Sequence, residues 1–241
     1  MKEIASNTVR MATPGQIKDI NALLIQAVPE ITFEVADQIL GDKSVFIGQV
    51  RNLFPKPEEI SDPVKSWERF YKKYFGITVD FSALVLPPKR EGFDRLIIVA
   101  EGLTLNQVSD VCAKAFPCWR YADDLNEAVP TNDRDPKNGA YAIWIRDRVE
   151  ADEELKNLSA DTLTERNIKG ITLLERMLFE LKYFSETKKH LDTGNWTLCN
   201  GSRNSDGDVP SARWLDGKFW VYYSSSDYHC PGLRSRKAVS L

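Results

Sequence analysis

The feature that most constrains the fold is an aromatic, alternating stretch near the C-terminus. Between Arg213 and Gly232, twenty residues hold six of the chain's 25 aromatic residues, where an even spread over 241 residues would give about two. Residues 218–223 within it read Lys-Phe-Trp-Val-Tyr-Tyr. Because neighbouring side chains of a strand point to opposite faces, this order predicts a β-strand with one core face and one outer face.

The alternation assigns the side chains of this strand to two sets. Phe219, Val221 and Tyr223 form the expected core face, and Trp220 and Tyr222 project outward. Serine, glycine, aspartate and histidine fill the surrounding sequence. Rigid aromatic residues mixed with small polar ones are typical of binding surfaces such as antibody paratopes. A strand buried on both faces, with the aromatic residues as plain core, remains the alternative.

Several longer motifs of the chain resemble a known family. They are residues 197–203 (TLCNGSR), 205–210 (SDGDVP), Trp214 and 233–240 (LRSRKAVS), with 141–155 and 170–176 upstream. The chain resembles, over roughly residues 85 to 241, the variable proteins of diversity-generating retroelements. The C-terminal domain of that family has a C-type lectin fold of the formylglycine-generating-enzyme subtype.

The resemblance implies a non-catalytic ligand-binding protein. In such systems a reverse transcriptase copies a template with errors at adenines, and the copy replaces the 3′ end of the gene. Fixed residues hold the fold while scattered surface positions change, so the ligand, which we expect to be a protein, differs between versions. The positions expected to share one exposed, variable face are Asn200, Asn204, Asp208, Ser211, Arg213, Leu215, Trp220, Tyr222, Ser224, Ser225, Tyr228, His229 and Cys230.

Two further expectations follow from the same resemblance. The side chains expected to lie beneath the variable face are Trp214, Phe219, Val221 and Tyr223. Trp220 departs from the family pattern, because adenine errors in the usual asparagine template codon cannot produce a tryptophan codon.

The expected fold is α+β, with a C-type lectin-like C-terminal domain preceded by a smaller helical and α/β region. The boundary is placed in residues 123–139, which are rich in Asp, Asn and Pro. Residues 1–137 then form the N-terminal region of unknown role, and residues 138–241 form the ligand-binding domain. In the lectin-type fold the first strand, here 141–145, pairs with the last, here 233–239.

Local patterns predict the individual elements. Apolar residues recur at helical spacing from Thr13, with Ile17, Ile20, Leu23 and Leu24 on one face. Further helices are expected at 33–40, 45–53, 64–75 and 104–116, and after the capping residues Ser159 and Thr172; strands are expected at 79–85, 95–100 and 119–121.

Composition limits the partners. The net charge of −3 lacks the clustered basic surplus of a nucleic-acid-binding protein. No stretch of about 18 apolar residues is present, so no membrane span is expected. The N-terminus lacks the apolar segment of a secretory signal, so a cytoplasmic location is the expectation, although export by another route stays open. The sequence does not fix the oligomeric state, and a monomer is favoured.

The chemistry of individual residues predicts neither a metal nor a cofactor. Residues 204–208 suggest calcium, but an EF-hand loop starting there would need Gly and Glu where Val209 and Leu215 stand. The enzymes that give the lectin subtype its name use a cysteine pair, so an oxidoreductase using Cys199 and Cys230 is the alternative function. We also expect the arginines at 146, 148, 203, 234 and 236 to pair with Asp147, Glu150 or Asp206.

Overall fold

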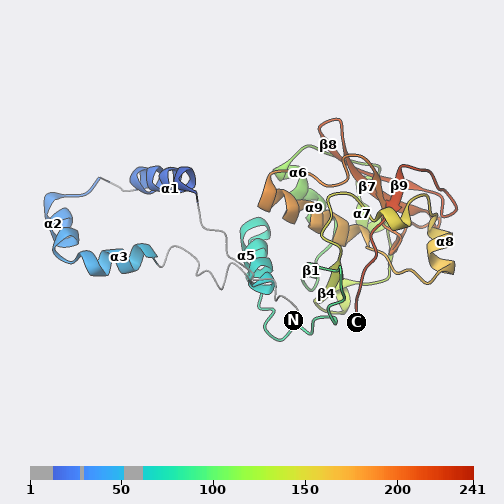
Figure 1. Ribbon diagram of the computed structural model, residues 1–241, viewed down its shortest axis with the longest axis horizontal. Coiled ribbons are helices and arrows are strands. Elements are labelled where there is room, and N and C mark those ends of the chain that lie inside the picture. The colour runs from blue at the N-terminus through green and yellow to red at the C-terminus, as the bar shows by residue number, and fades with distance from the viewer. Residues whose placement is uncertain (1–12, 28–29, 52–61) are drawn as a thin grey trace, which may run out of the picture. The chain divides into compact units, whose positions relative to one another are not determined.

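The computed structural model describes residues 13–27, 30–51 and 62–241 (Figure 1). The chain divides into two compact units, Met1–Ser66 and Trp67–Leu241. Across the described part of the chain it contains eight α-helices and a five-stranded mixed sheet, which confirms the expected α+β class. None of the helices in those ranges is both long enough and apolar enough to cross a bilayer.

In its described residues, the first unit contains three short helices and the start of a fourth, α5 (Pro63–Phe75). The three short helices are α1 (Pro14–Ala27), α2 (Phe33–Gly41) and α3 (Lys43–Arg51), close to the helices expected from the apolar spacing. The Thr32 side chain caps α2 by accepting a hydrogen bond from the Val35 amide at 3.4 Å. Residues 28, 29 and 52–61, which include part of the expected third helix, lie outside the described residues.

The main sheet of the second unit has the order β2-β8-β7-β5-β9. These strands are β2 (Cys118–Arg120), β5 (Trp196–Leu198), β7 (Val209–Leu215), β8 (Lys218–Ser224) and β9 (Leu233–Ser235). The β7–β8 and β5–β7 pairs are antiparallel, whereas β2 pairs with β8, and β9 with β5, in parallel. β8, β7 and β5 therefore form the centre of the sheet, the last strand β9 forms one edge, and β2, from much earlier in the chain, forms the other.

A two-residue turn fixes the register of the central hairpin. Asp216 and Gly217 connect β7 to β8 with φ angles of 50° and 75°. Two-residue hairpin turns of type I′ need a positive φ at both positions, and Asp-Gly is a preferred pair there. Leu215 therefore lies opposite Lys218, and Arg213 lies opposite Trp220.

Two smaller sheets tie the beginning of the second unit to its later part. β1 (Arg95–Val99) pairs antiparallel with β4 (Tyr141–Ile145), and β3 (Thr131–Asn132) pairs with β6 (Ser202–Arg203). The sequence predicted that residues 141–145 pair with residues 233–239, and of this pairing one isolated bridge is present. There the amides of Trp144 and Val239 each donate to the other residue's carbonyl at 2.9 Å.

Helices cover these sheets, and α9 (Leu173–Thr187) lies in the interior (Figure 1). It packs against α6, β1 and β7, and every residue from Leu173 to Lys182 is buried. A capping box at Thr172 and Glu175 begins it. The other helical segments are α5 (Pro63–Phe75), α6 (Leu105–Ala115), α7 (Leu125–Ala128), α8 (Ala160–Glu165), η1 (Pro136–Asn138) and η2 (Glu153–Leu155).

The strand pairing places the boundary elsewhere than the sequence suggested. Residues 123–139 do not separate two units, because β1 pairs with β4 and β2 pairs with β8 across this segment. The division falls instead between Ser66 and Trp67. Residues 79–85, expected as a strand, form turns and irregular backbone.

Candidate ligand-binding surface

The alternation of β8 places its side chains as the sequence suggested over most of its length. Phe219 and Val221 are buried in the core, whereas Tyr222 is 49% exposed and Trp220 is half-buried. The indole nitrogen of Trp220 donates to the Leu215 carbonyl at 3.0 Å, which fixes its ring over the hairpin. One face of β8 therefore belongs to the core and the other meets solvent.

Two of the four residues expected beneath this face lie differently. Tyr223 is 37% exposed, because it lies near the end of β8, where its ring meets Tyr121 at 4.7 Å between centroids. Trp214 is half-buried, and its ring lies parallel to the His190 ring at 3.3 Å between centroids. Of the four residues expected beneath the outer face, Phe219 and Val221 are therefore the two that are buried.

The thirteen expected surface positions fall into three groups. Four are exposed: Tyr222, Ser225, Tyr228 and His229. Six are half-buried: Asp208, Arg213, Leu215, Trp220, Ser224 and Cys230. Three are buried: Asn200, Asn204 and Ser211.

Asn200 and Asn204 are buried because their side chains hold turns together. The Asn204 Oδ1 accepts from the backbone amides of Asp206 and Asp208 at 2.9 and 2.8 Å. The Asn200 Nδ2 donates to the carbonyl of Ile168 at 3.2 Å, and a Cβ atom at Gly170 would lie only 1.7 Å from its Oδ1. The expectation that these two residues share the exposed face is therefore corrected, since their polar atoms serve the fold.

Five of the expected residues line one cavity of about 340 Å³ at this end of the sheet. They are Ser211, Tyr222, Ser224, Tyr228 and Cys230. Ser211 is thus buried from solvent but contributes to the wall of a hollow in the expected surface. The volume lies at the lower end of the range typical of small-ligand pockets, and is suited to one side chain of a larger partner.

Four aromatic residues around this surface were not among the expected surface positions: Trp119, Tyr121, Trp196 and Tyr223. Trp196, Tyr223 and Leu233 complete the cavity lining, and the Trp196 ring lies 6.4 Å from that of Tyr222. Trp119 of β2 is 37% exposed, and its ring centroid lies 4.7 Å from that of Trp220. We call the set of these rings the aromatic surface: Trp119, Tyr121, Trp196, Trp220, Tyr222, Tyr223 and Tyr228.

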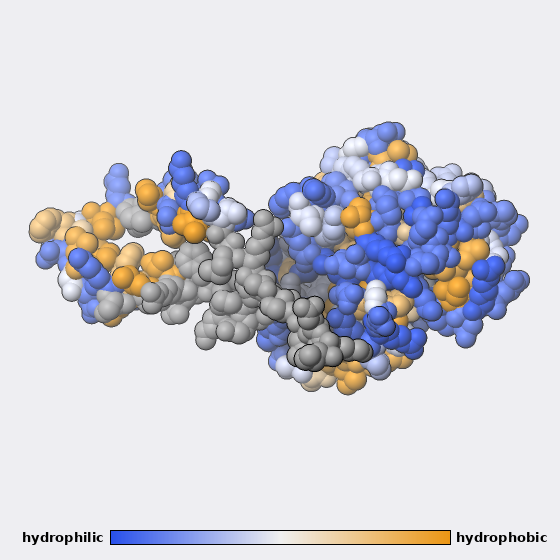
Figure 2. Space-filling model, in the orientation of Figure 1, coloured by the Kyte–Doolittle hydropathy of each residue, from blue (hydrophilic) through white to orange (hydrophobic). Residues whose placement is uncertain are grey.

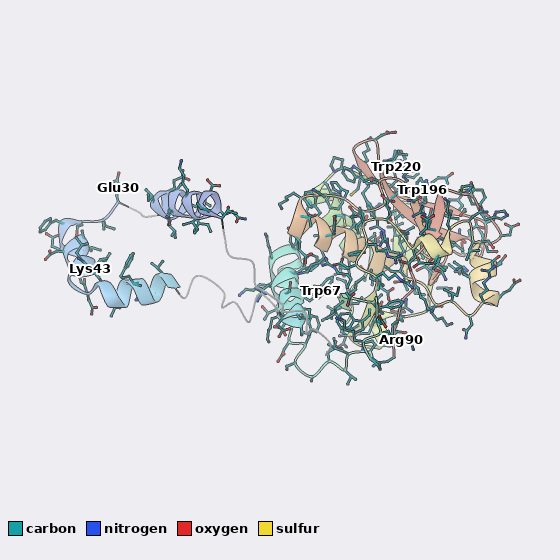
Figure 3. All side chains as sticks on the ribbon, in the orientation of Figure 1. Glu30, Lys43, Trp67, Arg90, Trp196 and Trp220 are labelled. Atoms are coloured by element: carbon teal, nitrogen blue, oxygen red, sulfur yellow. The ribbon has the colours of Figure 1, made fainter. Side chains whose placement is uncertain are left out.

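The parallel pairing of β2 with β8 explains why Trp119 joins this surface. Trp119 lies opposite Trp220 in the register, and its ring also stacks on Tyr222 at 6.1 Å and 29°. The sequence predicted a strand at 119–121, but nothing local indicates its partner. Figure 3 shows Trp196 and Trp220 in the same part of the second unit, on different strands of the sheet.

A buried network of charged residues lies within the second unit and joins α9 to the C-terminal tail. Asp192 accepts from the Nε of Arg176 at 2.9 Å and from the Nη2 of Arg236 at 2.7 Å. Arg176 also pairs with Glu180 at 2.9 Å, and all four side chains are at most 1% exposed. Burial lowers the pKa of Arg236, although Asp192 opposes the shift.

The arginines pair as a group, but with other acids than expected. Arg146 bonds Asp152 and Arg148 bonds Glu154, each at 2.7 Å. The remaining partners are Glu153 for Arg234, Asp192 for Arg236, and the carbonyls of Asn200 and Ser202 for Arg203. Arg146 and Arg148 pair with acids six residues further along the chain. Arg234 and Arg236 instead pair with acids of distant segments that meet only in the fold.

The two cysteines of the alternative function occupy different environments. Cys199 is completely buried, and burial raises the pKa of its thiol to about 12. Cys230 is partly buried, packs beside the cluster that contains Leu198 and Leu233, and shares a hydrogen bond with Tyr228 that raises the tyrosine pKa. Over the described ranges, no three His, Cys, Asp or Glu side chains are grouped to hold a metal ion.

Comparison of the chain with protein-family models, with curated proteins and with solved structures found no match in any of the three.

Proposed function

We propose that this chain is a non-catalytic ligand-binding protein whose C-terminal surface is diversified by a retroelement, on a C-type lectin-like fold. The resemblance of roughly residues 85 to 241 to variable proteins of such systems motivates the proposal. The single observation that supports it best is the alternation of core-facing and outward-facing residues along β8. Phe219 and Val221, which pack the core, alternate with Trp220 and Tyr222 on the outer face, and Tyr222 lines the cavity.

The aromatic surface has the composition of a protein-binding site. Tyrosine and tryptophan supply large contact area at small cost in conformational entropy, and they are frequent among the residues that dominate binding energy. The exposed Ser225 and His229 add adaptable hydrogen-bonding groups at its border. The exposed ring of Trp119 packs against the half-buried ring of Trp220, and this contact orders the surface before a partner binds.

The buried network suits a scaffold that must tolerate such changes. Asp192, Arg176 and Arg236 join α9 to the C-terminal tail through hydrogen bonds that involve none of the exposed positions. Substitution of Tyr222, Tyr228 or His229 leaves these bonds intact. Stability and recognition are thereby assigned to different residues of the same domain.

Two experiments test the proposal. The neighbouring DNA should contain a near-copy of the 3′ coding end that differs at adenines, beside a reverse transcriptase gene. A genome without such a copy contradicts diversification.

The second experiment measures the free energy of unfolding of a triple variant, Tyr222→Ser/Tyr228→Ser/His229→Asn. Exposed positions usually change it by no more than about 0.5 kcal/mol each. The control Phe219→Ala in the same strand should lose about 3–5 kcal/mol. A triple variant as unstable as this control would show that the outer residues serve the core.

No observation favours the oxidoreductase alternative with Cys199 and Cys230. A nucleophilic cysteine needs a lowered pKa and access to its substrate, and Cys199 has a raised pKa and no exposed surface.

A further inference from the structure

The helices of the first unit expose an unusual amount of apolar surface. Between residues 14 and 51, eleven large apolar side chains are 38–80% exposed, among them Leu23, Ile25, Phe33, Leu40, Val45 and Ile47. The whole of Trp67–Leu241 exposes eight. Hydrophobic residues are visible on the helices α1, α2 and α3 in Figure 2. Single exposed apolar residues are normal, but such a density indicates an interaction surface.

Residues 14–51 also lack the other means by which short segments are stabilised. Fewer than about 40 residues rarely bury enough surface to fold alone, and they need disulfides, metals or association. This segment contains no cysteine and no histidine, so neither a disulfide nor a structural zinc site can hold it. In the described residues of α2, no side chain is buried. Of disulfides, metals and association, only association is compatible with this composition.

We propose that α1, α2 and α3 bind the same helices of a second copy of this chain. A fully buried Val, Leu, Ile or Phe side chain removes about 60–120 Å² of apolar surface from water. Eleven side chains at about half exposure therefore offer roughly 300–700 Å² per copy, or roughly 700–1,300 Å² for two. This range includes the total of about 1,000 Å² that a specific interface needs.

The charge of the segment favours a protein partner over a lipid surface. Residues 13–51 contain five acidic and three basic residues, a net charge of −2. Helices that lie on membranes are rich in Lys and Arg on their polar face, because cell membranes carry anionic lipids. An acidic segment is repelled by such a surface, whereas two copies meet through their apolar faces.

Self-association would change how the aromatic surface acts. Each assembly would present that surface at least twice, and linked sites bind more strongly than either site alone when both can be engaged. The inference does not depend on the proposed function, because it rests on residues 14–51 and not on the aromatic surface. It replaces the expectation of a monomer, which took no account of this exposed apolar surface.

The test is the mass of the full chain by light scattering and sedimentation over a wide range of concentration. The expected mass is at least twice 27.4 kDa. The variant Leu23→Glu/Phe33→Glu/Leu40→Glu should sediment as a single chain. A second variant, Ile25→Gln/Val45→Gln, should weaken assembly at least tenfold, which shows that the effect does not depend on introduced charge.

The control is Val85→Glu, a position 67% exposed in the second unit, which should assemble like the unchanged chain. Thermal unfolding of the second unit must be the same in all variants, so that a misfolded domain is recognised. A full chain that is monomeric throughout overturns the inference. So does an assembly that survives both helix variants, or one that Tyr222→Ser dissociates. Binding to phosphatidylcholine vesicles without self-association also overturns it.

Discussion

Replacing Asp192 by asparagine tests whether the buried charge network holds the second unit together. Asp192 is completely buried, and its two oxygens receive hydrogen bonds from the Ala151 amide, Thr197, Arg176 and Arg236. Asparagine has nearly the same shape but no charge, and its amide group would face one of these donors. Both arginines would then be buried with Glu180 as the remaining carboxylate of the network.

The expected loss of unfolding free energy is about 3–5 kcal/mol, the cost of removing one partner from a buried ion pair. For a unit of this size, each kcal/mol lowers the midpoint of thermal unfolding by about 2–4 °C. The variant should therefore unfold roughly 6–20 °C earlier in calorimetry. The double variant Asp192→Asn/Arg236→Met should lose less than the sum of the two single variants, because it removes one of the unpaired charges.

The control is Asp216→Asn in the β7–β8 turn. Asp192 and Asp216 both have positive φ angles, 53° and 50°, which asparagine also tolerates, but Asp216 is exposed. Asp216→Asn should change the unfolding free energy by no more than about 0.5 kcal/mol. If Asp192→Asn differs from this control by less than about 1 kcal/mol, or if the double variant is additive, the reasoning about the network is refuted.

Three further results are expected. Burial lowers the pKa of Lys182 from 10.5 to about 8, so between pH 8 and 10.5 the unfolded chain binds more protons than the folded one. Over this range the free energy of unfolding should therefore rise with pH by about 3 kcal/mol relative to the variant Lys182→Met. Parallel pH profiles of the two proteins would contradict this. In the folded protein at pH 8, a maleimide should label Cys230 at least tenfold faster than Cys199, which is buried and whose pKa is raised to about 12. The labelling is measured by mass spectrometry of the digested protein, and equal rates at the two cysteines would contradict this expectation. Thr172→Ala should cost about 1–2 kcal/mol in denaturant unfolding, since it removes the cap of α9, while no change would show the capping box to be dispensable.

The local elements could be predicted because their signals lie within a few residues. Thr104 and Thr172 each begin a helix, and in both the residue three positions later completes a capping box. The alternation of residues 218–223 placed Phe219 and Val221 in the core. Such signals depend on spacing within a few residues, but they do not always decide the structure, since residues 79–85, expected as a strand, form turns and irregular backbone.

The pairing of distant segments could not be predicted, because no signal within a few residues of a strand specifies its partner. β2 lies about one hundred residues before β8, and the sequence of β2 does not specify which strand it joins. The prediction of the acid that pairs with Arg236 was wrong for the same reason, because Asp192 lies 44 residues away from it in the sequence. Asn200 and Asn204 look like surface residues in sequence, but their burial follows from turns that only the folded chain brings together.

If the C-terminal surface is diversified as proposed, residues near the edge strand β2 limit how far it can change. Trp119 and Tyr121 are encoded well upstream of residues 200–230, which contain the positions proposed to vary. Every version of the protein would inherit these two rings beside its altered ones. All versions of the protein would then prefer partners that offer flat apolar groups to these two rings. The versions would differ only in the contacts that they make around this shared one.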